Sequence, residues 1–410
     1  MNSKFFHSVM TARRRRNALS SIVVDGVEIE GVQPVRNTVF SHFASHFKAQ
    51  NVDRPSVENL RFRSLSVAEG GGLITPFSVD EVKAAVWDCD SYKSPGPDGV
   101  SFGFIKEFWS ILKDDLMWFV TEFHRNGKLT KGINATYIAL IPKIDCPRRL
   151  NYFQPISLVG SLYKILAKLL SNRLKVVIGS VVSESQTAFV KDRKILDGIL
   201  IANEVVDEAR RCKKDLMLFK VDFEKANDSV DWGYLDVVME QMSFPLLWRK
   251  WVRECVSTAT ASVLVNDSPT EEFQLFRGLR QGDPLSPFLF LLAAEGLNIL
   301  KKAMVDSQLF EGYRVGAASS VVLSHLQFAS DTLLLGAKSW ANVRSLRATF
   351  LIFEAMFGLK VNFNKSMFVG INISESWICE AASVLRCNVG KVPFLYLGLP
   401  IGGNPRRLSF

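Results

Sequence analysis

Cysteine and histidine are scarce in this chain, and no cysteines form a Cys-x-x-Cys pair. The six cysteines are scattered, and His42 and His46 are the only histidines four residues apart. Zinc modules and disulfide-rich secreted domains both need such residues at short, regular spacings. We therefore expect no zinc module and no secreted disulfide framework. Because no third ligand is close in sequence, His42 and His46 are interpreted as solvated or packed side chains.

Long hydrophobic runs are also missing. The longest run, Phe288–Ala294, is far shorter than the roughly 20 apolar residues that a membrane-spanning helix needs. The Arg13–Arg16 run near the N-terminus is not followed by the apolar stretch of a signal peptide. We expect a soluble, intracellular protein of the nucleus or cytoplasm. The arginine run is interpreted as a solvated helix face, with a nuclear-import or phosphate-binding patch as the alternative.

Apolar and basic residues are abundant. Of the 410 residues, 48% are hydrophobic and 30 are phenylalanine, and the formal net charge is +9. This length exceeds the usual size of one domain, so we expect two or three subdomains with a sizeable core. The positive charge favours polyanionic partners, because neutralised phosphates release counterions, although many basic proteins bind no nucleic acid.

Strands and helices are predicted to interleave, which indicates an α+β or α/β class. Helices are expected at 39–47, at 78–85 behind a capping box of Ser78 and Glu81, at 102–123, at 158–174, and after a cap at Asp231. Strands are expected at 135–142 and 216–222, and hairpins at 261–276 and 322–335. The glycine triplet in Glu69-Gly-Gly-Gly72 is interpreted as a linker.

The most informative pattern joins an apolar strand and a later hairpin. Asp222 ends the strand, and the polar turn of the hairpin holds Ser330 and Asp331. Carboxylates placed at a strand end and in a hairpin turn are the oxygen ligands that two-metal catalysis needs. The pattern predicts a polymerase-type metal centre in which Ser330 occupies one acidic position.

A series of motifs in this order resembles the reverse transcriptases of non-LTR (LINE-type) retrotransposons, especially those of plants. The motifs up to the first aspartate are Lys93-Ser-Pro-Gly-Pro-Asp-Gly99, Leu140-Ile-Pro-Lys143, Pro155-Ile-Ser-Leu158, Gln186-Thr-Ala-Phe-Val190 and Val221-Asp-Phe-Glu-Lys-Ala226. The later motifs are Arg277-Gly-Leu-Arg-Gln-Gly-Asp-Pro-Leu-Ser286, Phe328–Gly336, Gly358-Leu-Lys-Val-Asn362 with Lys365-Ser366, and Tyr396-Leu-Gly-Leu-Pro400. Their number and order, from about Thr75 to the C-terminus, carry the resemblance.

The resemblance implies an α+β right-hand polymerase fold with fingers, palm and thumb, whose ferredoxin-like palm sheet carries the site. It also implies RNA-directed DNA synthesis with Mg²⁺, an RNA template, a DNA primer and dNTPs. We expect a connector over residues 1–74, fingers over 75–215, palm over 216–375, and a truncated palm–thumb junction over 376–410. The thumb is thus expected to be largely absent.

Roles in catalysis follow from the matched motifs. Asp222 matches the first palm aspartate, a ligand shared by both metals, and Asp228 matches a second aspartate that is interpreted as structural. Asp331 is the remaining acidic candidate for the metal site. Lys365 matches a palm lysine that protonates the leaving pyrophosphate, with an ordinary surface lysine as the alternative.

Roles in nucleotide binding follow in the same way. Gln281 and Gly282 match the loop that packs against the template and the incoming nucleotide, with a plain turn glycine as the alternative for Gly282. Lys143 and Arg280 are expected to meet nucleotide phosphates, or else to be solvated surface cations.

The acidic turn departs from the family pattern at Ser330, which replaces an essential metal-binding aspartate. A neutral hydroxyl removes one negative charge, and the expected rate loss is on the order of 10³-fold or more. Asp331 is not expected to substitute, because neighbouring side chains on an extended hairpin point to opposite faces.

Three further departures concern the fingers and the nucleotide site. Asn227 replaces the Phe or Tyr that rejects the ribose 2′-hydroxyl, which predicts weaker sugar discrimination. Gln154 replaces an arginine that contacts triphosphate, and Asp192 replaces a glycine. We therefore predict an impaired or inactive polymerase. A non-catalytic RNA- or DNA-binding remnant is the alternative, and a polypeptide that is not made or does not fold stably is the third.

The ends of the chain also differ from the family pattern. No endonuclease domain precedes residue 1, and the sequence stops soon after the palm–thumb junction. The start, Asn2–His7, resembles the family's interdomain connector entered midway. We expect a fragment of a decayed element, or a gene model derived from one.

Overall fold

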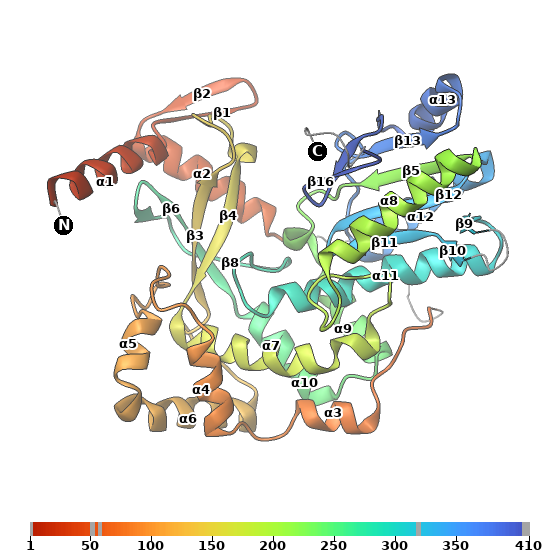
Figure 1. Cartoon of the computed structure of the whole chain (residues 1–410). Helices are drawn as coiled ribbons and strands as arrows, with labels where there is room; N and C mark the ends of the chain where they lie inside the picture. Colours follow the sequence, from red (N-terminus) through yellow and green to blue (C-terminus); the bar gives the residue numbers. More distant parts are fainter. Residues whose placement is uncertain (1–2, 50–53, 56–59, 317–320, 404–410) are drawn as a thin grey trace. The chain divides into compact units, whose positions relative to one another are not determined.

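Two compact units, interleaved along the sequence, make up the computed structural model (Figure 1). The structure describes residues 3–49, 54–55, 60–316 and 321–403. Unit 1 comprises residues 1–51, 74–172 and 246–286, and unit 2 comprises residues 52–73, 173–245 and 287–410. The chain thus passes between the units repeatedly. The contiguous connector, fingers, palm and junction expected from the sequence remain a prediction.

Unit 1 contains a helical part and a five-stranded sheet. Its helices are α1 (Ser3–Asn17), α2 (Val32–His46), α4 (Val79–Trp87), α5 (Phe102–Glu107), α6 (Trp109–Asn126) and α10 (Leu246–Ser257), and α7 (Ser161–Val181) starts in it. Its strands are β1 (Ser21–Val24), β2 (Val27–Glu30), β3 (Ala135–Pro142), β4 (Phe153–Val159), β6 (Thr260–Val265), β7 (Ser268–Pro269) and β8 (Phe273–Gln274). The side chains of the Arg13–Arg16 run in α1 lie outside the described residues.

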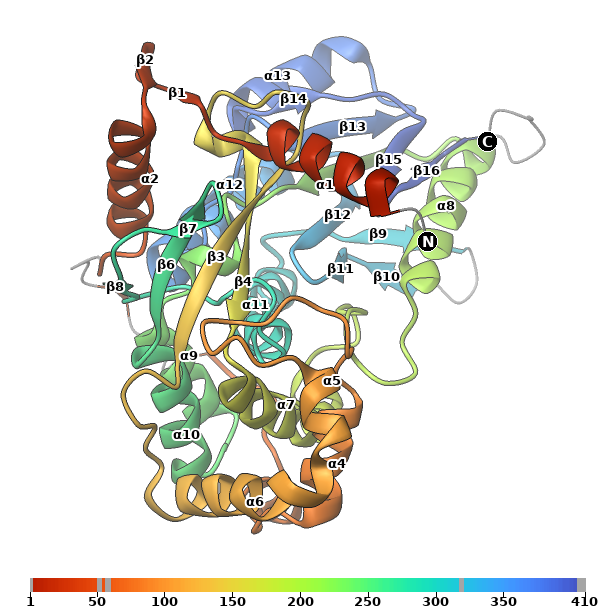
Figure 2. The same cartoon turned by 90° about the vertical axis from the view of Figure 1, so that its left-hand side faces the viewer.

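The strand β3, which was predicted with its observed limits, is central to the larger sheet of unit 1. It pairs with β4 in antiparallel register, from Thr136 opposite Val159 to Pro142 opposite Phe153, and with β6 in parallel register. Figure 2 shows β3 and β4 running side by side along their length. The hairpin predicted at 261–276 is confirmed, because β6 pairs with both β7 and β8.

The helix predicted from Leu158 begins later than expected. Leu158 lies in β4 opposite Tyr137, and α7 starts only at Ser161. The Asp98 carboxylate causes the delay, because its Oδ2 accepts hydrogen bonds from the Ser161 amide (2.5 Å) and hydroxyl (2.7 Å). This long-range helix cap cannot be seen in the local hydrophobic period.

The start of α4 follows the prediction, whereas the next helix differs from it. Ser78 accepts a hydrogen bond from the Glu81 amide, and the Glu81 carboxylate accepts one from the Ser78 amide, which completes the capping box. The helix predicted from Phe102 is two helices, α5 and α6, because the backbone leaves helical geometry at Phe108 (φ −98°, ψ 23°).

Unit 2 contains a second sheet with helices on its faces. Its helices are α3 (Val67–Leu73), α8 (Ile195–Cys212), α9 (Trp232–Gln241), α11 (Ser286–Asp306), α12 (Trp340–Phe357) and α13 (Glu375–Leu385). Its strands are β5 (Leu216–Val221), β9 (Tyr313–Val315), β10 (Val321–Leu323), β11 (His325–Phe328), β12 (Asp331–Ala337), β13 (Met367–Ile371), β14 (Asn388–Val389), β15 (Phe394–Tyr396) and β16 (Leu399–Ile401). As predicted, Asp231 caps α9 by accepting from the Tyr234 amide.

The sheet of unit 2 has the strand order β11-β12-β5-β13-β14. Side chains alternate between its faces. On one face, Leu216 and Leu218 share a buried core with α8 and with the β15–β16 hairpin. On the other face, the Phe219 ring packs against Phe350 of α12, with ring centroids 5.8 Å apart. Burial on both faces explains why β5 is an almost continuous apolar run.

The glycine triplet is not a linker. Glu69–Gly72 lies in α3, and the Glu69 carboxylate accepts hydrogen bonds from the Ser66 amide (2.8 Å) and hydroxyl (2.7 Å) and from the Ser180 hydroxyl. Gly70 packs so closely on Pro245 that an added Cβ would lie 3.3 Å from its ring. The helix therefore uses glycine for close packing, which outweighs its low helix propensity.

The hairpin predicted at 322–335 is present with a break. Its first strand divides at Ser324, so that β10 pairs with β9 whereas β11 pairs with β12. No helix in the described part of the chain combines the length and apolarity needed to cross a membrane.

Candidate active site

Asp222 directly follows β5, and its backbone is held by a later turn of unit 2. The Asp222 amide donates to the Ser366 hydroxyl (3.1 Å), and the Asp222 carbonyl accepts from the Asn362 amide (2.8 Å). The Ser366 hydroxyl in turn donates to the Asn362 carbonyl (2.8 Å). Two motifs far apart in sequence are thus joined at Asp222. Lys365, next to Ser366, is exposed.

The candidate acidic turn joins β11 to β12. Phe328 pairs with Asp331, so Ala329 and Ser330 form a two-residue turn. Thr332 pairs with Val221 of β5, and the same register continued by one residue sets Asp331 opposite Asp222. Side chains opposite each other in an antiparallel pair share a face.

This register changes the interpretation of Asp331. The sequence placed Asp331 on the face opposite to the metal-binding position, yet its charge is close enough to that of Asp222 to affect its protonation. Partial burial raises the pKa of the Asp331 carboxyl, Lys220 lowers it, and Asp222 raises it. The pairing with β5, rather than alternation within the hairpin, decides which face Asp331 shares.

Lys220 and Tyr396 complete the surroundings of the two carboxylates. Lys220 lies two residues before Asp222, hence on the same face of β5, and its Nζ donates to the Leu395 carbonyl of β15 (2.9 Å). The buried Tyr396 hydroxyl donates to the Asp331 carbonyl at 3.4 Å. Burial raises the pKa of Tyr396, so its hydroxyl remains a proton donor at neutral pH. The β15–β16 hairpin therefore contacts both carboxylate-bearing strands.

The donor set suits a divalent cation only in part. Two carboxylates on one face are hard oxygen ligands of the kind that Mg²⁺ prefers. The described residues contain no group of three or more His, Cys, Asp or Glu side chains that could hold a metal ion. Ser330, at the turn, contributes a neutral hydroxyl where a third carboxylate would complete such a group.

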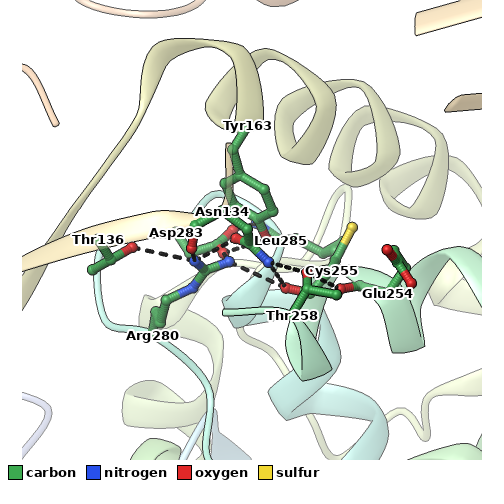
Figure 3. Close-up of polar contacts among 9 residues, drawn as sticks. All are labelled: Asn134, Thr136, Tyr163, Glu254, Cys255, Thr258, Arg280, Asp283 and Leu285. Carbon is green, nitrogen blue, oxygen red and sulfur yellow. Dashed lines mark hydrogen bonds and ion pairs between the residues drawn. The ribbon is translucent and has the colours of Figure 1, made fainter. Parts of the chain in front are cut away.

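Arg280 of unit 1 is buried in a polar network (Figure 3). Its guanidinium donates to Asn134 Oδ1 (2.7 Å), Thr136 Oγ1 (3.2 Å) and Asp283 Oδ2 (2.9 Å). The guanidinium also stacks on the Tyr163 ring, 4.2 Å from its centroid. Arg280 is 7% exposed, so this geometry does not support the phosphate contact expected from the sequence.

Tyr163 closes the network on Asp283. Its hydroxyl donates to Asp283 Oδ2 (2.7 Å), and burial raises the pKa of Tyr163 well above its ordinary value. The Asp283 Oδ1 atom accepts from the Leu285 amide (2.9 Å). Both carboxylate oxygens of Asp283 are thereby bonded within the protein, and the loop from Arg277 to Ser286 is fixed from inside.

The same loop packs closely on β4. The Ser157 amide donates to the Gln281 carbonyl (2.6 Å), and Gln154 Nε2 donates to Gln281 Oε1 (3.3 Å). Gly282 has φ +105°, and a Cβ there would lie 2.7 Å from the Ser157 carbonyl oxygen. Gly282 is therefore required by close backbone approach, as its motif predicted. Lys143, which follows β3, is exposed.

The remaining candidate residues lie in unit 2. Asn227 and Asp228 are in the 3₁₀ turn Asn227–Ser229, where Asn227 is half-buried and Asp228 is buried. Asp192 has φ +64°, a left-handed conformation that explains why glycine suits this position. In summary of location, unit 2 holds Asp222, Asn227, Ser330, Asp331 and Lys365, and unit 1 holds Lys143, Arg280, Gln281 and Gly282.

Lys220 and Tyr396 were present in the quoted motifs but were not predicted as site residues. The signal for Lys220 was available, because residues i and i+2 of a strand share a face. No local signal identifies Tyr396, which reaches Asp331 from 65 residues along the chain.

Carboxylates from two adjacent strands, brought to one end of an antiparallel sheet beside a hairpin turn, define the palm of a nucleic-acid polymerase. Comparison with known proteins narrows this class. Residues 141–401 match the family described as "Reverse transcriptase (RNA-dependent DNA polymerase)".

Named relatives are proteins of mobile elements. The chain is 29% identical over 368 residues to the "Transposon TX1 uncharacterized 149 kDa protein" of Xenopus laevis, covering 89% of this chain and 28% of the relative. It is 27% identical over 315 residues to the Pol polyprotein of retrotransposable element R2DM of Drosophila melanogaster, covering 75% and 28%. An R2 Pol polyprotein of Popillia japonica is 23% identical over 303 residues, covering 73% and 40%.

The chain belongs to the reverse transcriptase family, in its non-LTR, LINE-type branch, and has that family's palm and fingers fold. It spans less than half the length of each of these relatives.

Proposed function

We propose that unit 2 carries the nucleotidyl-transfer centre of an RNA-directed DNA polymerase, and that Ser330 weakens this centre severely. The carrying observation is the register that sets Asp331 opposite Asp222 at the end of the sheet, with Ser330 in the adjoining turn. The substrates implied by the family are an RNA template, a DNA primer and dNTPs.

Asp222 and Asp331 are the residues that would hold Mg²⁺. When bound, the metal supplies charge stabilisation for the attacking 3′-hydroxyl and the leaving pyrophosphate. The protein residues orient this pair of carboxylates. Ser366 and Asn362 fix the Asp222 backbone, and Tyr396 contacts the Asp331 carbonyl. Lys220 reduces the repulsion between the carboxylates.

Ser330 leaves this centre one negative charge short. Its hydroxyl is a weaker Mg²⁺ ligand than a carboxylate. Loss of several kcal/mol of transition-state stabilisation corresponds to a rate loss on the order of 10³-fold or more. We therefore infer slow or undetectable synthesis with Mg²⁺, in a fold that is otherwise intact.

Other residues have finer roles in this proposal. Lys365 donates a proton to the leaving pyrophosphate, and Asn227 lies where an aromatic side chain would reject the ribose 2′-hydroxyl. Lys143, Gln281 and Gly282 serve nucleotide and template binding from unit 1. We assign Arg280 a different role from the one expected, because its buried guanidinium holds the loop that contains Gln281 and Gly282.

Template-directed primer extension tests the proposal. The wild-type chain is compared with Ser330→Asp and with Ser330→Asp combined with Asn227→Phe, in Mg²⁺ and then in Mn²⁺. Ser330→Asn is the matched control, because it has nearly the size of aspartate without its charge. We expect Ser330→Asp to increase the extension rate about 10³-fold and Ser330→Asn to leave it unchanged. The Asn227→Phe change is expected to raise selectivity for dNTPs over rNTPs.

Wild-type extension as fast as that of Ser330→Asp would contradict the inferred impairment. Equal rates for Ser330→Asp and Ser330→Asn would show that charge at position 330 is not the missing element. If no variant extends a primer, the proposed catalytic function of this chain fails.

The absence of a three-ligand metal group in the described residues favours a second candidate, a nucleic-acid-binding protein without catalysis. This function predicts RNA or RNA–DNA binding whose affinity is indifferent to Ser330→Asp. Filter binding at low salt distinguishes the two candidates, and lack of binding to any nucleic acid there would eliminate the second.

A further inference from the structure

The motif Gln186-Thr-Ala-Phe-Val190 has no role in the function proposed above, yet Gln186 directly contacts the turn that contains Ser330. Gln186 is 1% exposed and lies in unit 2, as does the turn. Its Oε1 accepts a hydrogen bond from the Ala329 amide (2.8 Å), and its Nε2 donates to the Ala329 carbonyl (3.3 Å). One side-chain amide thus bonds both polar backbone groups of a single residue.

The conformation of Ala329 makes this contact significant. Ala329 has φ +51°, in the left-handed region that costs a residue with a Cβ roughly 1–2 kcal/mol. Ser330 follows immediately, so the dihedral angles of Ala329 set the direction of the residue at position 330. The hydrogen bonds to Gln186 favour this conformation over an ordinary extended one.

Gln186 is itself held firmly. The segment around it runs beside the edge strand β11, since the Thr187 amide donates to the Gln327 carbonyl (2.9 Å) and the Gln327 amide donates to the Ser185 carbonyl (2.9 Å). The Gln186 carbonyl accepts from Arg193 Nη1 (2.6 Å). Because the backbone of Gln186 is fixed, its side chain can act as a rigid support for the turn.

Gln327 gives only partial redundancy. Its Nε2 also donates to the Ala329 carbonyl (3.1 Å). The Ala329 amide, in contrast, is bonded by Gln186 Oε1. Loss of Gln186 would therefore leave the carbonyl with a donor and remove this acceptor from the amide.

We propose that Gln186 is a positioning residue of the polymerase centre, whose side-chain amide clamps Ala329 and thereby orients position 330. This role rests on the proposed function, whereas the clamp itself does not. The effect on chemistry is expected to be largest when position 330 is the metal-binding aspartate.

The first test measures the clamp without any catalysis. Hydrogen–deuterium exchange is compared between the wild-type chain and Gln186→Met, which keeps the side-chain length and removes both hydrogen bonds. We expect exchange in peptides that contain Ala329 to become roughly 5- to 10-fold faster, with β5 peptides unchanged. Thr187→Val is the matched control, because it removes the hydroxyl bond to the Gln327 carbonyl and leaves the Ala329 bonds in place.

The second test measures positioning by primer extension in the Ser330→Asp background. Gln186→Met is expected to lower kcat about 10- to 100-fold while the KM for dNTP stays within about 2-fold. Ala329→Gly is expected to restore part of the lost kcat, because glycine adopts the left-handed conformation without the cost of a Cβ. A general loss of folding would not be rescued in this way.

The outcomes separate the clamp from the proposed function. Unchanged exchange at the turn in folded Gln186→Met overturns the inference. Equal losses of kcat in Gln186→Met and Thr187→Val also overturn it. If Ser330→Asp itself extends no primer, the proposed function fails and the exchange result alone decides the clamp. If Gln186→Met does not fold, Gln186→Asn takes its place, since asparagine keeps a buried amide but is one methylene too short to reach Ala329.

Discussion

At the scale of single residues, the clearest lesson comes from Arg280. A basic residue within a nucleotide-site motif suggests a phosphate contact, but this guanidinium is enclosed by Asn134, Thr136 and Asp283 and lies over Tyr163. A buried ion pair is destabilised strongly when one partner is removed, because the remaining charge stays desolvated. Arg280 and Asp283 are therefore expected to act as one structural unit.

We predict that Arg280→Met destabilises the protein by about 3–5 kcal/mol, since Asp283 would remain buried without its cation. Lys143→Met is the control, because it removes an exposed cation and is expected to change stability by less than about 0.5 kcal/mol. Urea denaturation measures both. A stable Arg280→Met variant with a raised KM for dNTP would instead support the phosphate contact expected from the sequence.

At the scale of elements, helix α11 carries buried ionisable groups that its apolar sequence conceals. Lys301 is fully buried, with its Nζ 3.3 Å from the centroid of the Phe310 ring. No hydrogen-bond acceptor contacts this Nζ within the described residues. Burial lowers the pKa of Lys301 from near 10.5 to about 7. On the same helix, burial raises the pKa of Glu295 to about 7.

The pKa of Lys301 predicts how stability depends on pH. Between pH 7 and 10.5 the unfolded chain holds a proton on this lysine that the folded chain has lost, so stability contributed by Lys301 increases as pH rises. Below pH 7 the folded state pays the full cost of the buried charge, which the Phe310 contact offsets in part.

We therefore predict that Lys301→Met stabilises the protein at pH 7 by on the order of a few kcal/mol, and that the gain shrinks towards pH 10. Chemical denaturation at several pH values measures this difference. Lys302→Met is the control, because Lys302 is exposed on the same helix. A gain that does not depend on pH would mean that Lys301 remains charged in the folded protein.

At the scale of the whole molecule, the formal charge of +9 and the family membership both indicate a nucleic-acid partner. Lysine and arginine contacts to phosphates release counterions, which makes such binding depend steeply on salt. Each unit contains its own candidate residues, and interleaving means that each is assembled from several segments of the chain.

We predict that the affinity for an RNA–DNA hybrid falls at least about 10-fold between 50 and 200 mM salt. Fluorescence anisotropy with a labelled hybrid measures it, and a hybrid with a neutral backbone analogue is the control. Salt-independent affinity would show that phosphate contacts do not dominate binding.

The sequence by itself determined the family, the strand β3, the capping box of Ser78, the cap at Asp231 and the place of Asp222 and Ser330 in the chain. These features depend on neighbouring residues or on ordered motifs, and local chemistry is sufficient to recognise them.

Only the tertiary structure decided how Asp331 relates to Asp222, why Arg280 is buried and what Gln186 does. The physical reason is the same in each case. Side chains bond to groups that are far away along the chain, as Gln186 does to Ala329 and Tyr396 to Asp331. Strand register, burial and buried hydrogen bonds arise only when those segments are brought together.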